Sequence, residues 1–167
     1  MQMLKSGYKF KSILLIYLLF FNIKSQHHLF SEEKNIQIPE DLKPLLNILK
    51  EKGFNVKFEI PPRKNVYGLF ESKSKTLWIS PISFYEGIGR NILLHEATHA
   101  AQSCPFGFLT PLNLKLSVSP LVRKEIQRIL LNNYESSNFL IEKEAYYVQT
   151  QKNGVNLLLK SLAKRCK

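Results

Sequence analysis

The amino-acid sequence predicts an α+β domain. Three observations predict this class: an amphipathic helical pattern comes first, short runs rich in β-branched and aromatic residues follow between residues 54 and 80, and helical spacing of apolar residues dominates from residue 85 onwards. A helix, a small antiparallel sheet and a run of helices, in this order, are expected to pack as an α+β fold. The length of 167 residues and the content of 44% hydrophobic and 22% charged residues suit one globular domain.

The first helix is predicted for residues 39–52. Its leucines fall on one face, Pro44 fits within the first turn, where a missing N–H costs little, and Gly53 follows as a stop signal. Residues 54–60 then alternate between apolar and polar side chains, which predicts a strand that ends at Pro61.

A hairpin is predicted next, from two short β-rich runs at residues 66–70 and 76–80 that are joined by a polar linker. Pro81 closes the hairpin. A single long helix is expected from about residue 85 to residue 103, because Pro105 and the glycine that follows shortly after it stop the helical pattern.

The remainder of the chain is expected to be mainly helical. Residues 106–119 predict an irregular segment, rich in leucine, proline and asparagine. Pro120 is well placed at the start of a helix. The helices are expected at about residues 120–132, 138–152 and 155–165.

Residues 1–25 predict a secretory signal peptide. Three lysines without an acid precede an apolar run at residues 13–21, which is about half the length that a membrane-spanning helix needs. An uncleaved membrane anchor and a buried core helix are the alternatives. We therefore expect a single domain over residues 26–167 and an exported protein, secreted or periplasmic. Contact with a membrane is expected only through residues 1–25, if they are not removed.

The charge of the chain points to anionic partners but not to nucleic acid. The net charge is +11, and the part after residue 25 retains 20 of the 24 basic residues and all 13 acids, which leaves +7. No helix-turn-helix pattern, RNP-like motif or zinc-finger spacing accompanies it. The two cysteines, Cys104 and Cys166, are compatible with one disulfide in an oxidising compartment or with two separate buried thiols.

The chemistry is predicted from an HExxH motif inside the long helix. His95 and His99 are four residues apart, so both imidazoles can point from one helix face towards one metal ion. Glu96 lies beside His95 and can reach a water molecule on that ion without binding the ion itself. A catalytic zinc ion needs such an open position and a nearby base.

The third metal ligand is approached by elimination. After His99 the chain contains no histidine and no aspartate, so the candidates are later glutamates and Cys104. Glu144 is preferred, because its neighbours three and four positions away are largely apolar and a carboxylate buried among them needs a compensating cation. Glu142, on a more mixed face, is the second choice. A buried ion pair of Glu144 with a lysine or arginine is the alternative that needs no metal.

Residues 95–102, together with Glu144 and the Ala-Tyr pair after it, resemble small members of the gluzincin group of zinc metallopeptidases. The resemblance covers the motif helix and the glutamate helix, and the hairpin only by its layout. It implies a zincin-like fold, a Zn²⁺ ion held by His95, His99 and Glu144, and Glu96 as the catalytic acid and base. The implied activity is hydrolysis of peptide bonds in a peptide or protein substrate.

The same resemblance implies that the strand at residues 76–80 lies along the substrate cleft. Trp78 and Tyr147 are then candidates for substrate contact, and Tyr146 or Tyr147 could donate a hydrogen bond to the reacting carbonyl oxygen. Packing in the core is the alternative role for each aromatic residue. Gln102, one turn beyond His99, is a candidate for a hydrogen bond that orients a metal ligand, or for a helix cap.

Two other functions stay open at this point. One is a zinc-binding zincin-like domain without activity. The other is a basic membrane-surface protein that uses the N-terminal segment and the leucine- and lysine-rich C-terminal helix, although those leucines suit packing on a core equally well.

Overall fold

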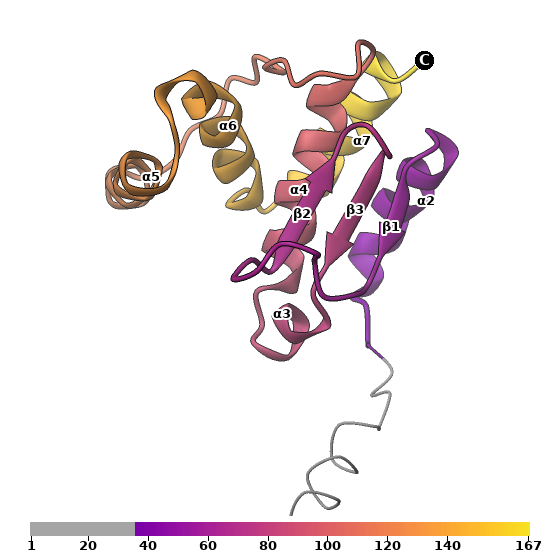
Figure 1. Cartoon of the computed structure of the whole chain (residues 1–167). Coiled ribbons are helices and arrows are strands. Elements are labelled where there is room, and N and C mark those ends of the chain that lie inside the picture. Colours follow the sequence, from indigo (N-terminus) through magenta and orange to yellow (C-terminus); the bar gives the residue numbers. More distant parts are fainter. Residues whose placement is uncertain (1–35) are drawn as a thin grey trace, which may run out of the picture. The chain divides into compact units, whose positions relative to one another are not determined.

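The computed structural model describes residues 36–167, which form one compact unit with one hydrophobic core (Figure 1). The predicted signal peptide, residues 1–25, lies outside the described residues. Within the described part the fold is α+β, with six α-helices, two short 3-10 helices and a three-stranded mixed sheet. The predicted α+β class is confirmed.

The first helical segment is found where it is predicted. A 3-10 turn, η1 (Glu40–Leu42), leads into α2 (Lys43–Glu51). The leucines of its inner face are fully buried, and Gly53 ends the segment with a φ of 79°, a backbone conformation that glycine adopts without strain.

The sheet is mixed, so the expectation of a purely antiparallel sheet is wrong. Strand β2 (Gly68–Glu71) pairs antiparallel with β3 (Thr76–Ile79), as the hairpin predicts, but β1 (Asn55–Lys57) pairs parallel with the other edge of β3. Strand β2 occupies one edge of β3 and β1 the other, and the connection through residues 58–67 carries the chain from β1 across to β2. Strand β1 is also shorter than predicted.

The predicted long helix is two helices, α3 (Pro81–Tyr85) and α4 (Gly89–Ser103). The break falls at Gly87, whose φ of 74° takes the chain out of the helical conformation. Helix α4 is buried continuously from residue 93 to the residue after its end. Such a helix lies in the centre of a core.

The other helices surround α4. Helix α4 packs against β2, β3 and α3 on one side and against α6 (Phe139–Gln149) and α7 (Gly154–Arg165) on the other (Figure 1). Helix α5 (Pro120–Asn133) packs on the outside of α6. The irregular segment before them is as predicted, and the bounds of the helices differ from the prediction by a few residues. The elements are α5 (Pro120–Asn133), η2 (Ser136–Asn138), α6 (Phe139–Gln149) and α7 (Gly154–Arg165).

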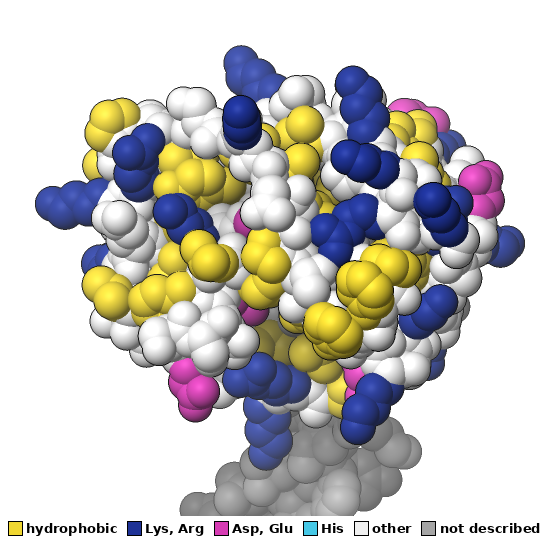
Figure 2. Space-filling model, turned by 90° about the horizontal axis from the view of Figure 1, so that it is seen from above, with side chains coloured by type: hydrophobic (Ala, Val, Ile, Leu, Met, Phe, Trp, Pro, Cys, Tyr) yellow, Lys and Arg dark blue, Asp and Glu magenta, His cyan; other side chains and the backbone are white. Residues whose placement is uncertain are grey.

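Residues 104–119 and the C-terminus lie at one end of the described part, at the top of Figure 1. Figure 2 looks onto this end, where Lys and Arg side chains are interspersed with hydrophobic ones and acidic side chains are few. None of the helices in residues 36–167 is both long and apolar enough to cross a membrane.

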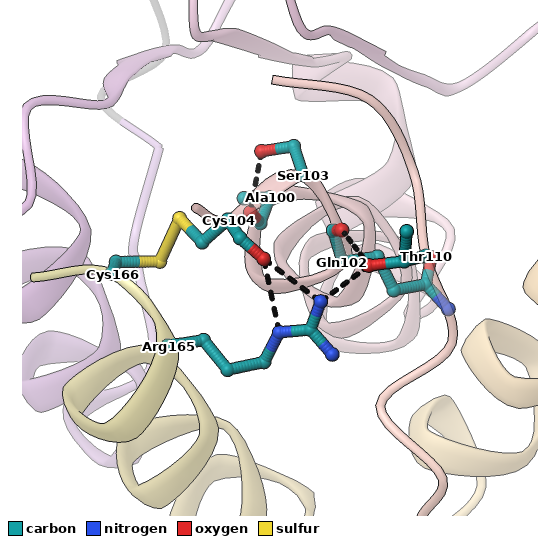
Figure 3. The surroundings of a disulfide bond; sticks show 7 residues. All are labelled: Ala100, Gln102, Ser103, Cys104, Thr110, Arg165 and Cys166. Atoms are coloured by element: carbon teal, nitrogen blue, oxygen red, sulfur yellow. Dashed lines mark hydrogen bonds between the residues drawn. A yellow bond between two sulfur atoms is a disulfide. The ribbon is translucent and has the colours of Figure 1, made fainter. Parts of the chain in front are cut away.

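A disulfide bond joins Cys104, at the end of α4, to Cys166, which follows α7, and their Cα atoms lie 5.1 Å apart. The structure thus decides between the two possibilities that the sequence left open. Arg165 strengthens this junction, because its guanidinium donates to the backbone oxygen of Cys104 and to the side chain of Thr110 (Figure 3), and also to the backbone oxygen of Pro111. The end of the chain is therefore fastened to the end of α4.

Candidate metal centre

Helix α4 presents its two histidines to one point. His95 and His99 are one helical turn apart and only 8% and 7% exposed. Their Nε2 atoms lie 3.1 Å from each other. The spacing of the HExxH motif therefore brings the two imidazoles together on one helix face, as the sequence predicts.

Helix α6 supplies the third group, and it is Glu142. Oε2 of Glu142 lies 3.3 Å from Nε2 of His95 and 3.5 Å from Nε2 of His99. The three side chains are the one group of metal-ligating residues that the described part of the chain brings together, with ligand atoms within 4.8 Å of one another. The predicted order of preference between Glu144 and Glu142 is thus reversed.

Glu144 has a different partner. Its carboxylate accepts hydrogen bonds from the backbone N–H groups of Leu112 and Leu114, at 2.7 and 3.0 Å, and from the side-chain amide of Gln102 at 2.9 Å. The apolar neighbours of Glu144 do indicate an inward-facing carboxylate. Backbone donors of the irregular segment, rather than a cation, compensate its charge.

Two glutamines orient the imidazoles. Oε1 of Gln149 lies 2.9 Å from Nδ1 of His95, and Oε1 of Gln102 lies 2.8 Å from Nδ1 of His99. An amide oxygen only accepts, so each Nδ1 carries the hydrogen and each neutral ring keeps an unprotonated Nε2. The amide of Gln102 has no freedom to turn round, because its nitrogen donates to Glu144 and to the backbone oxygen of Ile141.

This arrangement fits a metal ion. A tetrahedral ion bound to nitrogen and oxygen at about 2.0–2.2 Å needs ligand atoms about 3.4 Å apart, close to the observed 3.1, 3.3 and 3.5 Å. With hydrogen on both Nδ1 atoms, Oε2 of Glu142 faces two lone pairs, and it is buried without a hydrogen-bond partner. A cation between the three atoms would satisfy all of them at once.

The charges of the site also favour a cation. Burial by itself would raise the pKa of Glu142, but the two imidazoles, when protonated on Nε2, donate hydrogen bonds to its carboxylate, outweigh the burial and hold that pKa at about 2. Burial would lower the pKa of His99, whereas Glu142 and Glu96 raise it above its usual value. A site that attracts a proton to His99 has the negative potential that a metal ion needs, and the metal has to displace that proton.

Glu96 is buried next to this cluster without belonging to it. Strand β2 passes directly beside it: the backbone N–H of Phe70 donates to its carboxylate, and a Cβ atom on Gly68 would lie 2.5 Å from its Oε1. Burial raises the pKa of Glu96, and the nearby histidines offset this only in part. A carboxyl group with a raised pKa is suited to accept and return a proton.

We expect Gly68→Ala to destabilise the protein by about 1–3 kcal/mol, because the new methyl group collides with Glu96 and with Ile92, whose Cγ2 would be 2.6 Å away. Denaturant unfolding measures the change. The control Glu71→Ala, at the exposed end of the same strand, should stay within about 0.5 kcal/mol of the parent. Equal stability of Gly68→Ala and the parent would show that β2 and α4 are not in this close contact.

Two tyrosines complete the surroundings of the histidines. The ring of Tyr146 packs edge-on against His95, with centroids 4.7 Å apart, and its hydroxyl lies 3.3 Å from that of Tyr134. Burial and the negative charge of Glu142 raise the pKa of both tyrosines, so their hydroxyl groups stay protonated. Tyr146 and Gln149 follow Glu142 by four and seven positions, a one-sided helical spacing that sequence analysis could have used to choose Glu142.

The structure does not bring the two predicted substrate-contacting residues to the cluster. Tyr147 lies on another side of α6 from Glu142 and lines a cavity of about 320 Å³ between α6 and residues 111–116. Trp78 is in the middle strand, and its neighbours Leu77 and Ile79 face the core, so Trp78 is on the opposite face of the sheet.

Comparisons with known proteins give no match for this chain: no protein-family model, no curated protein and no solved structure matches it. The class of the site therefore follows from geometry alone. It is a buried group of two histidines and one glutamate, from two helices, that could hold a metal ion.

Proposed function

We propose that the protein is a zinc-dependent metallopeptidase, with His95, His99 and Glu142 as metal ligands and Glu96 as the general base. The observation that carries this proposal is the convergence of the three ligand atoms within 4.8 Å, next to a second acid, Glu96, which is buried and is not part of the ligand cluster. Catalytic zinc sites have three protein ligands of these types and keep one position open, whereas structural sites are closed by four. The arrangement also fits the gluzincin resemblance and a zincin-like fold, with Glu142 in the role first expected of Glu144.

The residues of the chain would divide the work of amide hydrolysis. When bound, zinc supplies a Lewis acid that polarises a carbonyl group and makes water more acidic near neutral pH. Glu96 accepts the proton of the attacking water on its carboxylate and passes it to the leaving amine. The hydroxyl groups of Tyr146 and Tyr134 can donate hydrogen bonds to the negative charge that develops on the carbonyl oxygen of the substrate.

The substrate strand is proposed to lie along β2 rather than β3. Strand β3 is flanked by a strand on each side, so its backbone has no free edge, whereas β2 is an edge strand in the described part of the chain. Glu96 accepts from the N–H of Phe70 at that edge. An extended peptide added to β2 would therefore run past the general base.

We also propose that the protein is exported. The disulfide between Cys104 and Cys166 supports this, since such bonds persist in oxidising compartments and are rare in the cytosol. The pattern of residues 1–25 points the same way.

Removal of the metal tests the proposal. We expect the purified protein to contain a single zinc ion, to cleave members of a broad peptide library, to lose activity when a chelator extracts the ion, and to regain it when zinc is returned. Elemental analysis and peptide mass spectrometry measure the two properties. Zinc without any cleavage would indicate a non-catalytic zinc domain, and a protein unable to bind metal would contradict both functions.

A further inference from the structure

Three of the ten exposed large apolar residues of the described part lie close together on one loop. The leucines of α7, which the sequence made candidates for contact with a membrane, belong to the core: Leu158 and Leu162 are fully buried. In contrast, residues 105–109, here named the aromatic loop, are all exposed. Phe106 is 66% exposed and Phe108 is 61% exposed. Exposed aromatic side chains gathered on one loop mark a contact surface more often than single exposed apolar residues do.

The rings of Phe106 and Phe108 form one continuous apolar surface. Phe106 and Phe108 stack with centroids 5.5 Å apart and an angle of 17° between their planes, and Leu109, 37% exposed, follows them. Stacking within the loop satisfies only one face of each ring. The other faces stay in water, where exposure of apolar surface is unfavourable relative to burial.

The aromatic loop is held in place at both ends (Figure 3). At its start, the disulfide ties Cys104 to the end of the chain, and the N–H of Gly107 donates to the backbone oxygen of Ser103. At its other end, the N–H of Thr110 donates to the backbone oxygen of Gln102, and Arg165 binds the Thr110 side chain. A loop ordered in advance loses little conformational entropy when it binds.

The charge around the aromatic loop is mainly positive. Between Glu96 and Glu125 the chain has no acidic residue, and it has none after Glu144. Figure 2 shows basic side chains throughout this end of the described part. Arg165 and Cys166 are both bonded to Cys104, the residue just before the loop. The exposed Lys164 and Lys167 are their direct neighbours in the chain. The basic residues of these two acid-free stretches are Lys115, Arg123, Lys124, Lys152, Lys160, Lys164, Arg165 and Lys167.

We propose that the aromatic loop docks the protein on an anionic lipid bilayer, with Phe106 and Phe108 inserted at the headgroup boundary and the surrounding lysines on the anionic headgroups. Apolar side chains that project from a mainly basic surface match the two properties of such a membrane, an apolar interior and a negative surface. A protein partner would instead need a pocket for two rings and an acidic rim around it. An anionic bilayer offers an apolar interior and a negative surface without needing a matching shape, so charge complementarity favours the bilayer.

Docking in this way fixes where the metal centre stands. The aromatic loop begins directly after α4, and His99 lies five residues before Cys104, about 7.5 Å along the helix axis. The histidines would therefore be held close to the bilayer surface. This inference uses no property of the proposed peptidase and stands or falls separately from it.

A local fluorescent reporter tests the insertion in the full chain. Trp78 is the only tryptophan, so Phe106→Trp adds one reporter and the parent protein supplies the background. With vesicles of phosphatidylcholine and phosphatidylglycerol, we expect the added tryptophan to shift to shorter wavelength and to be quenched by brominated acyl chains. Ile60→Trp is the control: Ile60 is 72% exposed and belongs to the connection between β1 and β2, which lies at the other end of the described part in Figure 1, so its tryptophan should stay in water.

The charge requirement is tested with the same reporter. Lys164→Gln and Lys167→Gln should each weaken insertion about fivefold. Lys64→Gln, which changes an exposed lysine of the same connection as Ile60, should not change it. Position 106 remaining in water on vesicles to which the chain is bound would overturn the proposal, because another segment would then carry the binding. Equal insertion of positions 60 and 106 would overturn it as well. So would a shift that depends on protein concentration without lipid, which would assign the loop to a protein contact.

Discussion

Glu96→Gln is expected to lower the rate of peptide hydrolysis by about 10²–10⁴-fold while zinc stays bound. Glutamine keeps the size of the side chain and an oxygen that can accept from the N–H of Phe70, so the contact with β2 persists. It has no carboxylate to take the proton of the attacking water. Because Glu96 is outside the ligand cluster, the affinity for zinc should change little. Steady-state cleavage of an identified peptide and elemental analysis measure the two effects.

Glu125→Gln is the matched control for this substitution. It is the same chemical change on an exposed glutamate of α5. The carboxylate of Glu125 pairs with Arg128 and forms no hydrogen bond with a proposed metal ligand. Its activity and zinc content should equal those of the parent. Full activity of Glu96→Gln would remove Glu96 from the mechanism, and loss of zinc from this variant would instead make Glu96 a ligand.

Glu142→Ala is expected to abolish stoichiometric zinc binding and, with it, activity. It removes the carboxylate oxygen that lies 3.3 and 3.5 Å from the two imidazole nitrogens. The loss of affinity should exceed the about 10–100-fold typical of residues that only orient a ligand. Competition with a fluorescent zinc chelator measures the affinity, and circular dichroism checks the fold. Glu142→Gln, which keeps the shape of the side chain, serves as a second variant in case the alanine variant unfolds.

Glu144→Ala separates the two glutamates, since it makes the same change two positions further along α6. It leaves the N–H groups of Leu112 and Leu114 and the amide of Gln102 without their acceptor, so stability should fall by about 1–3 kcal/mol. Zinc should still bind at full stoichiometry, with an affinity at most about 100-fold lower, because Gln102 orients His99 less firmly.

The opposite pattern would restore the order of preference that the sequence suggests. A folded Glu144→Ala variant without zinc, together with a Glu142→Ala variant that retains it, would make Glu144 the ligand. Retention of zinc in both variants would mean that a group other than these two glutamates completes the site.

Much of the fold can be predicted from the sequence because its signals are local. Four leucines at helical spacing mark η1 and α2, two β-rich runs around a polar turn mark β2 and β3, and Pro120 marks the start of α5. The break between α3 and α4 was missed, since Gly87 has the conformational freedom to end a helix but does not have to use it. The parallel pairing of β1 was missed because strand pairing depends on a distant partner.

The sequence by itself determined the chemistry of α4: an interval of four residues places His95 and His99 on one helix face wherever the helix lies. Only the tertiary structure decided which glutamate joins them. Glu142 and Glu144 are about 200° apart around α6, on opposite flanks of the apolar ridge that packs on α4. Both flanks are partly buried, one against the histidines and the other against backbone N–H groups of residues 112 and 114. Local periodicity reports that a flank is covered, but the direction in which two helices cross determines what covers it.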